Sequence, residues 1–388
     1  MRHKNSVFHQ LQQHIPWSVF DKLVDEHKAD HRVRRLDTKG QFLALLFGQL
    51  AGAKSLREIE VGLLSQKTRL YHVGARTVAR TTLADANAKR PADLFSDLFA
   101  HMAATASRRT RRHMRDSVRL IDATRIRLSS VFGGWADMIG GRNAIKVHLT
   151  YDPFADVPLN AKITGQKTND IVPARQTEII PGVTYVFDLA YYDFGWWAKI
   201  DQCGARFVTR LKTNTTVTLS QQTRFRRPRA KQDAIVSDAI GQLPQRMASS
   251  RQNPFQKPVR VVTVLLKTGK TLRLVTNDLD APAQEIAELY KQRWQIELFF
   301  KWIKQNLNIR HFLGRSENAV RIQIFVALIA HILLRLAQSC QTSILQPLAF
   351  TRLVRLTIME RRALTALKTI PDPPPQDPRQ MSFPLWPS

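Results

Sequence analysis

Apolar residues recur at helical spacing over the first hundred residues, with short polar breaks between the runs. Such spacing predicts amphipathic helices that share one buried face. Ser55 followed by Glu58 has the form of a capping box, which would open one of these helices. The predicted helices are Val19–His27, Lys39–Ala51, Ser55–Ser65, Thr82–Ala88 and Pro91–Ala104.

The pattern changes to short runs rich in β-branched residues, bounded by Gly, Pro or Asp, after an arginine-rich stretch near residue 110. Runs of this kind predict strands, and we expect them to alternate with two helices, at Thr168–Ile179 and Phe194–Cys203. The predicted strands are Val118–Ala123, Arg125–Ser130, Ala144–Thr150, Val157–Gly165, Val183–Leu189 and Arg206–Lys212.

A third kind of pattern covers residues 213–280, where basic loops alternate with two apolar runs. Val259–Lys267 and Thr271–Asn277 predict a hairpin around Gly269, which could belong to a small sheet. Helical spacing then returns, and the last stretch, Pro371–Ser388, holds seven prolines and predicts an extended tail. The later predicted helices are Pro282–Asn308, Asn318–Ser339 and Phe350–Thr369.

These elements together predict an α/β fold with a helical region in front of it and a β-rich insertion within it. We expect a helical domain to precede a catalytic core that the insertion divides, with a C-terminal helix and a Pro-rich tail at the end. The predicted boundaries are 1–105, 106–212, 213–280, 281–341 and 342–388.

The balance of charged residues indicates which class of partner the protein binds. Lys and Arg number 59 against 31 Asp and Glu, which leaves a formal net charge of +28. A field of that sign captures polyanions such as nucleic acid, an anionic membrane surface or an acidic protein. A membrane span is not expected, because the longest apolar run, Ile324–Ala330, is far short of the roughly 20 residues that spanning requires.

The N-terminus has no apolar h-region, so we expect no secretory signal. Two cysteines are too few for a disulfide framework or a thiolate metal site. A reducing cytoplasm fits both observations.

The helix predicted from Pro282 carries one acid among cations on a single stripe. At about 100° per residue, all members of the stripe lie within roughly 60° of Tyr290 around the helix axis. A solvated face with ordinary i,i+4 ion pairs explains this equally well. The alternative is a carboxylate that binds a metal while its neighbours hold phosphate oxygens. The residues of this stripe are Tyr290, Arg293, Glu297, Lys301 and Lys304.

Two further acids stand at the ends of apolar strands. Asp122 follows Leu120–Ile121, and Asp188 follows Val186–Phe187. A charge at such a place is costly unless it is paired or holds a metal, although a structural or capping role is the alternative for each residue. With Glu297, these acids could hold two magnesium (or manganese) ions that activate an attacking oxygen and stabilise a leaving one.

Three sequence blocks resemble signature blocks of the DDE transposases of the IS-four insertion-sequence family. They are LIDAT around Asp122, VFDLAYYDF around Asp188, and Y-x2-R-x3-E-x6-K from Tyr290 to Lys304. The resemblance covers roughly residues 110–310. The first 75 or so residues also resemble the helical N-terminal domain of one branch of this family.

The resemblance implies an RNase H-like core with Asp122, Asp188 and Glu297 as catalytic metal ligands, and a β-rich insertion between the second and third acids. It also implies double-stranded DNA, both transposon ends and target, as the partner, and we expect a homodimer on DNA. One residue departs from the family pattern. Leu189 stands where relatives commonly have Arg, and the missing Arg is expected to weaken phosphate contact there.

Two basic clusters are candidates for phosphate contacts, which set affinity rather than sequence preference. A solvated linker is the alternative for each cluster. The first cluster comprises Arg108, Arg109, Arg111, Arg112, Arg115 and Arg119, and the second comprises Arg224, Arg226, Arg227, Arg229 and Lys231.

Other conspicuous residues have simpler explanations. Asp193 is expected to cap the helix that begins at Phe194, and His148 to be a core or supporting histidine. Trp196 and Trp197 are expected in a helix core rather than as platforms for DNA bases.

Three functions remain open on the sequence. The favoured one is a transposase that cuts element ends and joins them to target DNA. The second is an RNase H-like nuclease that only hydrolyses DNA, and the third is a DNA-binding repressor with an inactive core. The three differ in strand transfer and in metal-dependent nicking.

Overall fold

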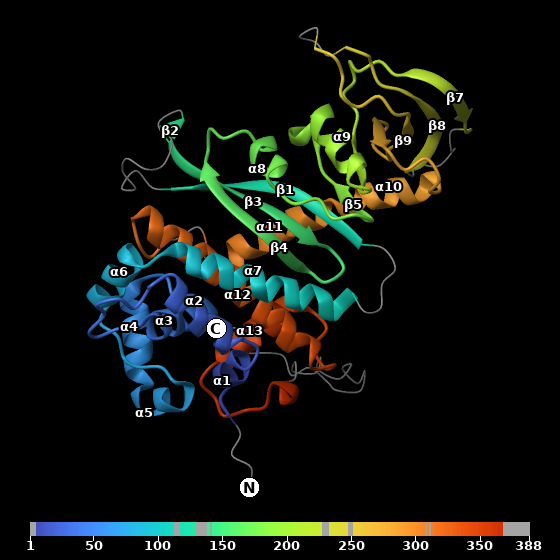
Figure 1. Cartoon of the computed structure of the whole chain (residues 1–388). Helices are drawn as coiled ribbons and strands as arrows, with labels where there is room; N and C mark the ends of the chain where they lie inside the picture. Colours follow the sequence, from blue (N-terminus) through green and yellow to red (C-terminus); the bar gives the residue numbers. More distant parts are fainter. Residues whose placement is uncertain are drawn as a thin grey trace, which may run out of the picture.

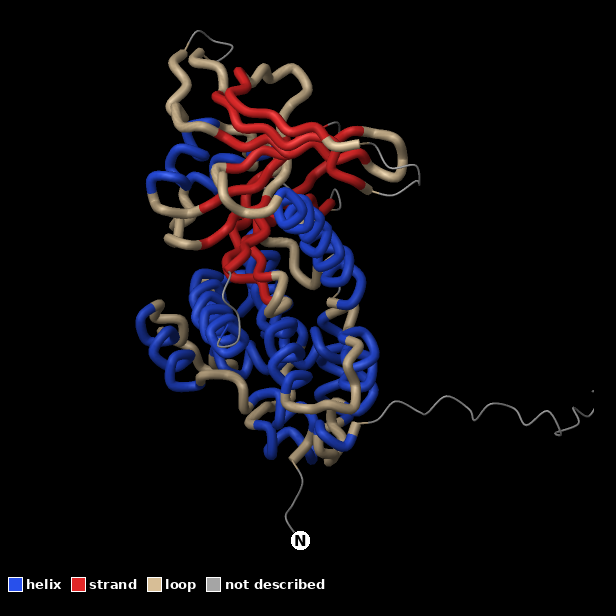
Figure 2. The backbone as a smooth tube through the Cα atoms, turned by 90° about the vertical axis from the view of Figure 1, so that its right-hand side faces the viewer, coloured by secondary structure: helices blue, strands red, loops and turns tan. Residues whose placement is uncertain are grey.

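The computed structural model of the chain describes residues 5–111, 117–128, 138–139, 142–226, 233–246, 251–307, 309 and 312–367. A layer of helices and a large mixed sheet lie against each other (Figure 2). Several predicted features lie outside the described residues: Arg112, Arg115, Arg227, Arg229, Lys231 and the Pro-rich tail, together with the side chains of Arg109 and Arg111.

The N-terminal region is helical, as predicted. The Ser55 cap is confirmed, since Ser55 Oγ accepts a hydrogen bond from Glu58 N at 3.1 Å, while the Glu58 carboxylate accepts one from Lys54 N. The elements are α1 (Val7–Gln12), α2 (Trp17–Glu26), α3 (Thr38–Ala51), α4 (Leu56–Ser65), α5 (Lys67–Leu70), η1 (Tyr71–Val73), α6 (Arg80–Lys89) and α7 (Ala92–Arg111).

The long helix α12 (Glu317–Ser339) runs through this layer and packs against α3, α6, α7 and the sheet strand β4 (Figure 1). It is long and apolar enough for a membrane span by length and composition, but 83% of that stretch is buried inside the protein. Its apolar surface is therefore used in the core.

The last described residues of the chain pack against its first helix, α1. Helix α13 (Pro347–Thr357) packs on α3, and η3 (Leu364–Ala366) follows. Backbone hydrogen bonds join Val7 N to Glu360 O at 3.0 Å and Phe8 N to Ile358 O at 2.8 Å. One apolar core thus joins elements from all parts of the chain that we predicted to lie in separate domains. The predicted helix over Phe350–Thr369 is shorter, because the chain turns after Thr357 to pair with α1.

The sheet has the order β2-β3-β1-β5-β6-β10-β9-β8-β7, with β4 paired to β3. The first three long strands are antiparallel, whereas β5 and β6 run parallel to β1. The bounds are β1 (Ser117–Arg127), β2 (Met138–Ile139), β3 (Arg142–Asp152), β4 (Val157–Gly165), β5 (Val183–Val186) and β6 (Arg206–Arg210).

One predicted strand boundary of this part was wrong, and one predicted helix is shorter than expected. The strands at Val118–Ala123 and Arg125–Ser130 are one strand, β1, because its pairing with β3 runs unbroken from Leu120 to Arg127. The helix at Thr168–Ile179 shrinks to α8 (Ile171–Arg175). A β-branched run leading into Pro181 follows α8, and the residue before a proline disfavours helix.

The predicted hairpin is confirmed as β9 (Val259–Leu265) and β10 (Thr271–Thr276), with Gly269 at a φ of +81° in the turn. The insertion is not a separate small sheet, however. Strand β10 pairs antiparallel with β6, so β7 (Thr218–Arg224), β8 (Ala234–Gln242) and the hairpin extend the main sheet. These strands lie at the upper right of Figure 1.

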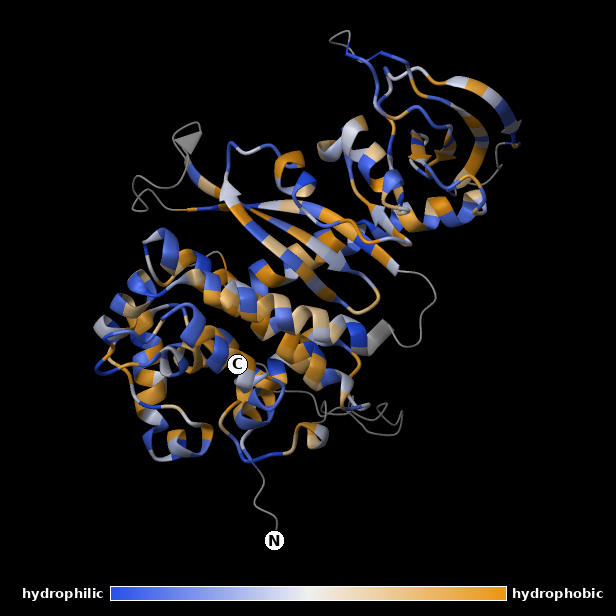
Figure 3. Ribbon diagram, in the orientation of Figure 1, coloured by the Kyte–Doolittle hydropathy of each residue, from blue (hydrophilic) through white to orange (hydrophobic). Residues whose placement is uncertain are grey.

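The sheet separates two apolar clusters, visible as hydrophobic residues inside both layers (Figure 3). Val118 and Leu120 of β1 face the helical layer, whereas Ile121 faces α8 and α9 (Phe194–Gln202). Trp196 and Trp197 of α9 are fully buried in the second cluster, as predicted.

Because one core spans both layers, we predict that they unfold together. Leu333→Ala on α12, a fully buried residue, should cost about 2–5 kcal/mol of unfolding free energy. Far-UV circular dichroism and tryptophan fluorescence should follow a single shifted transition. Leu64→Ala on α4, where Leu64 is 57% exposed, is the matched control and should cost less than about 0.5 kcal/mol. Two separate transitions, of which only one shifts, would instead support independent domains.

Candidate active site

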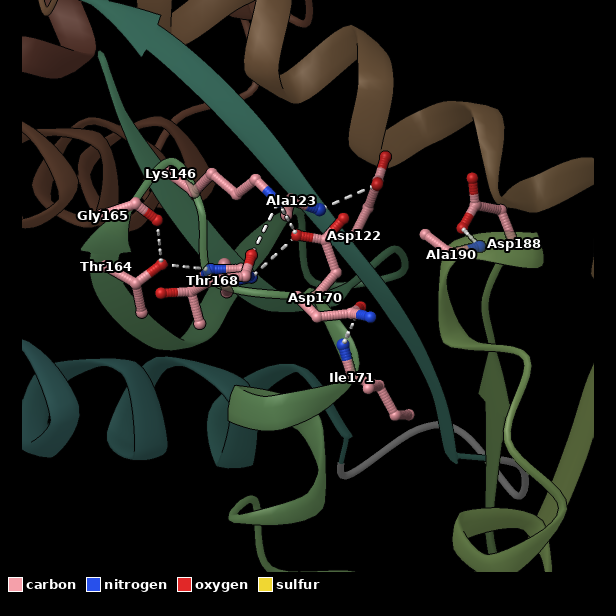
Figure 4. Close-up of polar contacts among 12 residues, drawn as sticks. Asp122, Ala123, Lys146, Thr164, Gly165, Thr168, Asp170, Ile171, Asp188 and Ala190 are labelled. Carbon is pink, nitrogen blue, oxygen red and sulfur yellow. Dashed lines mark hydrogen bonds and ion pairs between the residues drawn. The ribbon is translucent and has the colours of Figure 1, made fainter. Parts of the chain in front are cut away.

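Asp122 and Asp188 come from neighbouring parallel strands. Leu120 of β1 lies opposite Val186 of β5, so the same register brings the two aspartates level with each other just beyond the paired residues. Figure 4 shows the two side chains at these adjacent positions. Each carboxylate is fixed by a local backbone bond, from Ala123 N to Asp122 Oδ1 and from Ala190 N to Asp188 Oδ1, both 2.8 Å.

The third acid lies on a helix behind the sheet. The predicted helix from Pro282 consists of α10 (Ala283–Gln292) and α11 (Trp294–Asn306). Arg293 separates them, although its backbone stays in the helical region at φ −51° and ψ −31°. Glu297 stands in the first turn of α11, and α11 packs against β1, the strand of Asp122.

Arg293 joins two of the three acids. Its Nη1 lies 2.6 Å from Glu297 Oε1 and 3.9 Å from Asp122 Oδ2. These two carboxylate oxygens are therefore no farther apart than the sum of the two distances, about 6.5 Å. Burial disfavours the charged guanidinium, but the bond to Glu297 and the nearby acids outweigh it, so the pKa of Arg293 rises.

Asp122 shows the electrostatic consequence of this arrangement. Its side chain is 18% exposed, and burial raises the pKa of the carboxyl to about 7. The charges of Asp188 and Glu297 raise this pKa further, whereas the Ala123 N–H and Arg293 lower it. The site thus concentrates negative charge in a poorly solvated place, which favours a bound cation.

The donor set fits a hard divalent cation, since it consists of carboxylates and leaves positions for water or phosphate. Within the described part of the chain, no three His, Cys, Asp or Glu side chains are grouped closely enough to hold one ion. Arg293 explains the spacing, because its guanidinium lies between Asp122 and Glu297. A divalent cation between the carboxylates would offset their repulsion at closer approach.

The remaining residues of the predicted stripe do not share one environment. Tyr290 is buried, and its ring lies 5.8 Å from the Arg293 guanidinium carbon, so it supports Arg293. Lys304 Nζ donates to Thr124 Oγ1 and to Arg125 O on β1 and thereby ties α11 to that strand. Lys301 is exposed and lines a different cavity, described below.

One described member of the basic clusters, Arg119, is half-buried in β1, the strand that also carries Asp122. The other three lie elsewhere on the surface. Arg108 is exposed on α7 and donates to Ala104 O of its own helix. Arg224 and Arg226 are exposed at the end of β7. Nothing in their described contacts joins them to Asp122, Asp188 or Glu297.

Two predicted structural roles are confirmed. Asp193 caps α9, because its carboxylate accepts from Trp196 N at 2.7 Å. His148 is a buried histidine, and burial lowers its pKa to about 4, so it is neutral at physiological pH. Its Nε2 lies 2.8 Å from Thr164 Oγ1.

Sequence reasoning gave no site role to Tyr191. Its side chain is buried, its hydroxyl has no partner among the described residues, and its pKa is raised by burial and by Asp122, Asp170 and Asp188. It therefore stands close to two of the three proposed ligands. The sequence signal is its place three residues after Asp188, within the block VFDLAYYDF that resembles the family signature.

We predict that Asp122→Asn stabilises the metal-free protein at pH 8 but not at pH 4. A carboxyl whose pKa is higher in the folded chain than in the unfolded chain destabilises the fold as it ionises, here between about pH 4 and pH 7. The upper limit of the gain is about 4 kcal/mol. The melting temperature at each pH, with and without magnesium, measures it.

Magnesium should raise the melting temperature of the wild type and not that of Asp122→Asn. Asp193→Asn, which alters a helix cap outside the site, is the control and should gain stability at neither pH. An equal gain in melting temperature for Asp122→Asn at pH 4 and pH 8 would show that ionisation of the Asp122 carboxyl does not destabilise the fold.

Comparison with known proteins relates this geometry to a family. The family described as "Transposase DDE domain" matches residues 113–333, and a "Domain of unknown function (DUF4372)" matches residues 3–76. "Putative transposase y4zB" of Sinorhizobium fredii is 41% identical over 78% of this chain and 85% of its own length. "Probable transposase for insertion sequence element IS5377" of Geobacillus stearothermophilus is 32% identical over 63% of each chain.

Among solved structures, a piggyBac transposase synaptic complex with hairpin DNA aligns with 92% of this chain and 81% of its own. Its TM-score is 0.47 and its sequence identity 12%. The family match spans more than half of the chain and includes all three acids. This chain belongs to the DDE transposase family and is an insertion-sequence transposase, an enzyme that acts on DNA.

Proposed function

We propose that this transposase cuts the ends of its element and joins them to target DNA at one site made by Asp122, Asp188 and Glu297. The observation that carries the proposal is their convergence from β1, the end of β5 and α11. Asp122 feels the charge of both other acids, and one Arg293 nitrogen contacts Asp122 and Glu297. Asp122, Asp188 and Glu297 are far apart in sequence, and the stability of the fold does not require their side chains to lie close together.

Asp122, Asp188 and Glu297 would hold two divalent ions, magnesium or manganese. Such a pair activates the attacking oxygen and stabilises the leaving one in phosphoryl transfer. The fixed orientation of Asp122 and Asp188, each bonded to a backbone N–H, pre-organises two of the ligands.

Arg293 would change partners when DNA binds. Its planar guanidinium suits a phosphate group. A metal cation bound between Asp122 and Glu297 would release Arg293 from these two carboxylates. Tyr290 keeps the guanidinium close to the site in either state. Lys304 would act mainly by holding α11 against β1, which sets the distance between Glu297 and Asp122.

The strand order supports an RNase H-like core. Strands β4, β3 and β1 are antiparallel neighbours and β5 and β6 follow in parallel, with acids on β1 and directly after β5. The three sequence blocks favour the IS-four branch. We further propose that the protein acts as a homodimer on double-stranded DNA in the bacterial cytoplasm, with helices of residues 1–105 contacting the element ends.

Replacing Asp122, Asp188 or Glu297 by Ala should lower magnesium-dependent nicking by at least about 10³-fold. DNA binding should remain, because phosphate contacts from Lys and Arg supply most of the affinity. A nicking assay and a gel-shift assay on the same proteins measure the two effects. Asp193→Ala is the matched control, an aspartate of the same motif that caps a helix, and should keep nicking. Normal nicking by any of the three variants would remove that acid from the site.

The insertion would lie along DNA and contribute exposed cations. Replacing Arg224 and Arg226 by Ala should flatten the slope of log affinity against log salt by about 2, since each phosphate contact contributes about 0.9. Fluorescence anisotropy with a DNA duplex at several salt concentrations measures the slope. The control is Lys270→Ala, since Lys270 is an exposed cation in the turn of the β9–β10 hairpin. An unchanged slope would mean that Arg224 and Arg226 are merely solvated.

Strand transfer decides between the remaining functions. A protein that nicks element ends but joins none of the freed 3′ ends to target DNA is a nuclease of the same fold. A protein that binds without nicking is a repressor. The convergence of the three acids favours the transposase over the repressor.

A further inference from the structure

A largely apolar cavity of about 600 Å³ lies beside α11, between α13, α12 and the β3–β4 turn. We call it the α11–α13 groove. Exposed leucines border it, since Leu298 is 49% exposed and Leu348 is 36% exposed. The residues that define it here are Tyr151, Leu298, Phe299, Trp302, His331 and Leu348.

The groove has an aromatic wall. The ring of Phe299 lies 5.0 Å from that of Tyr151 and 4.9 Å from that of His331, and the Trp302 ring lies 4.9 Å from His331. Aromatic walls of this kind are the usual receptors for Pro-rich segments, whose extended conformation costs little entropy to bind.

Two polar atoms of the wall have no partner in the described chain. Trp302 Nε1 and His331 Nδ1 are buried without a hydrogen bond, although His331 Nε2 contacts Asp156 O at 2.8 Å. A buried N–H without an acceptor costs about 1–3 kcal/mol. A backbone carbonyl seated in the groove would accept a hydrogen bond from Trp302 Nε1. His331 already donates through Nε2 to Asp156 O, so its Nδ1 would need a donor, such as a backbone N–H of the seated segment.

We propose that the groove receives residues 381–387 of the same chain, the sequence MSFPLWP. The segment offers Phe383, Leu385 and Trp386 for the apolar cavity and prolines for the aromatic wall. The structure describes the chain to Leu367, and the 21 residues that follow can span up to about 70 Å when extended. This reach exceeds the diameter of a chain of this size, roughly 50 Å.

The net charge of the C-terminal segment favours it over other possible occupants of the α11–α13 groove. Residues 368–388 carry two Lys or Arg and two Asp, so they have no net charge and the rest of the chain carries all of the +28. A second copy would bring an equal positive field against the groove. DNA is disfavoured, because the lining is mostly apolar and includes an acid, Asp156, as well as its one lysine, Lys301.

Disulfide trapping in the full-length chain tests the proposal. Cys203 and Cys340 are replaced by Ser, and Ser388→Cys is combined with Gln305→Cys, an exposed residue of the groove. The control combines Ser388→Cys with Leu356→Cys on α13, which is 77% exposed, outside the groove and closer to Leu367 in sequence.

Docking in the same chain predicts a monomeric disulfide that forms at least about tenfold faster with Cys at 305 than with Cys at 356, on a non-reducing gel after mild oxidation. Replacing Phe383, Leu385 and Trp386 by Ser should reduce the faster rate to the control rate. Equal rates in the two proteins would overturn the proposal. A dimeric disulfide through position 305 would also overturn it and would identify a second copy as the source of the segment.

Discussion

The proposed site depends on holding three like charges together. Asp122, Asp188 and Glu297 repel one another, and burial makes the repulsion stronger at Asp122 than it would be in water. Arg293 offsets this repulsion by contacting two of the acids at once. The geometry of the proposed site therefore reflects two opposing forces. The carboxylates repel one another, and the guanidinium of Arg293 attracts two of them.

The rest of the fold keeps that balance in place. The parallel pairing of β1 with β5 sets Asp122 beside Asp188, and the contact of Lys304 with β1 sets the position of α11. Behind α11, the helical layer is joined by α12 into one core with the sheet. A rigid support of this kind suits a site whose ligands would otherwise move apart.

The sequence predicted most of the elements and led to the proposal of the three acids. Strand patterns ended at Asp122 and Asp188, and the spacing from Tyr290 to Lys304 put an acid among cations on one helix. It could not show that Lys304 bonds to β1 rather than to solvent, because that contact joins residues 180 positions apart. Nor could it show that β10 pairs with β6, since pairing depends on tertiary position and not on local pattern. The contact between the chain after Thr357 and α1 could not be predicted for the same reason, because it joins residues at the two ends of the described chain.

Metal binding in the absence of DNA tests the central claim most directly. Manganese titration followed by electron paramagnetic resonance should show ions bound to the wild type and strongly weakened binding in Asp122→Ala, Asp188→Ala and Glu297→Ala. Arg293→Ala should bind manganese at least as well as the wild type, because the competing guanidinium is gone. Unchanged manganese binding in any one of the three acid variants would contradict the shared site.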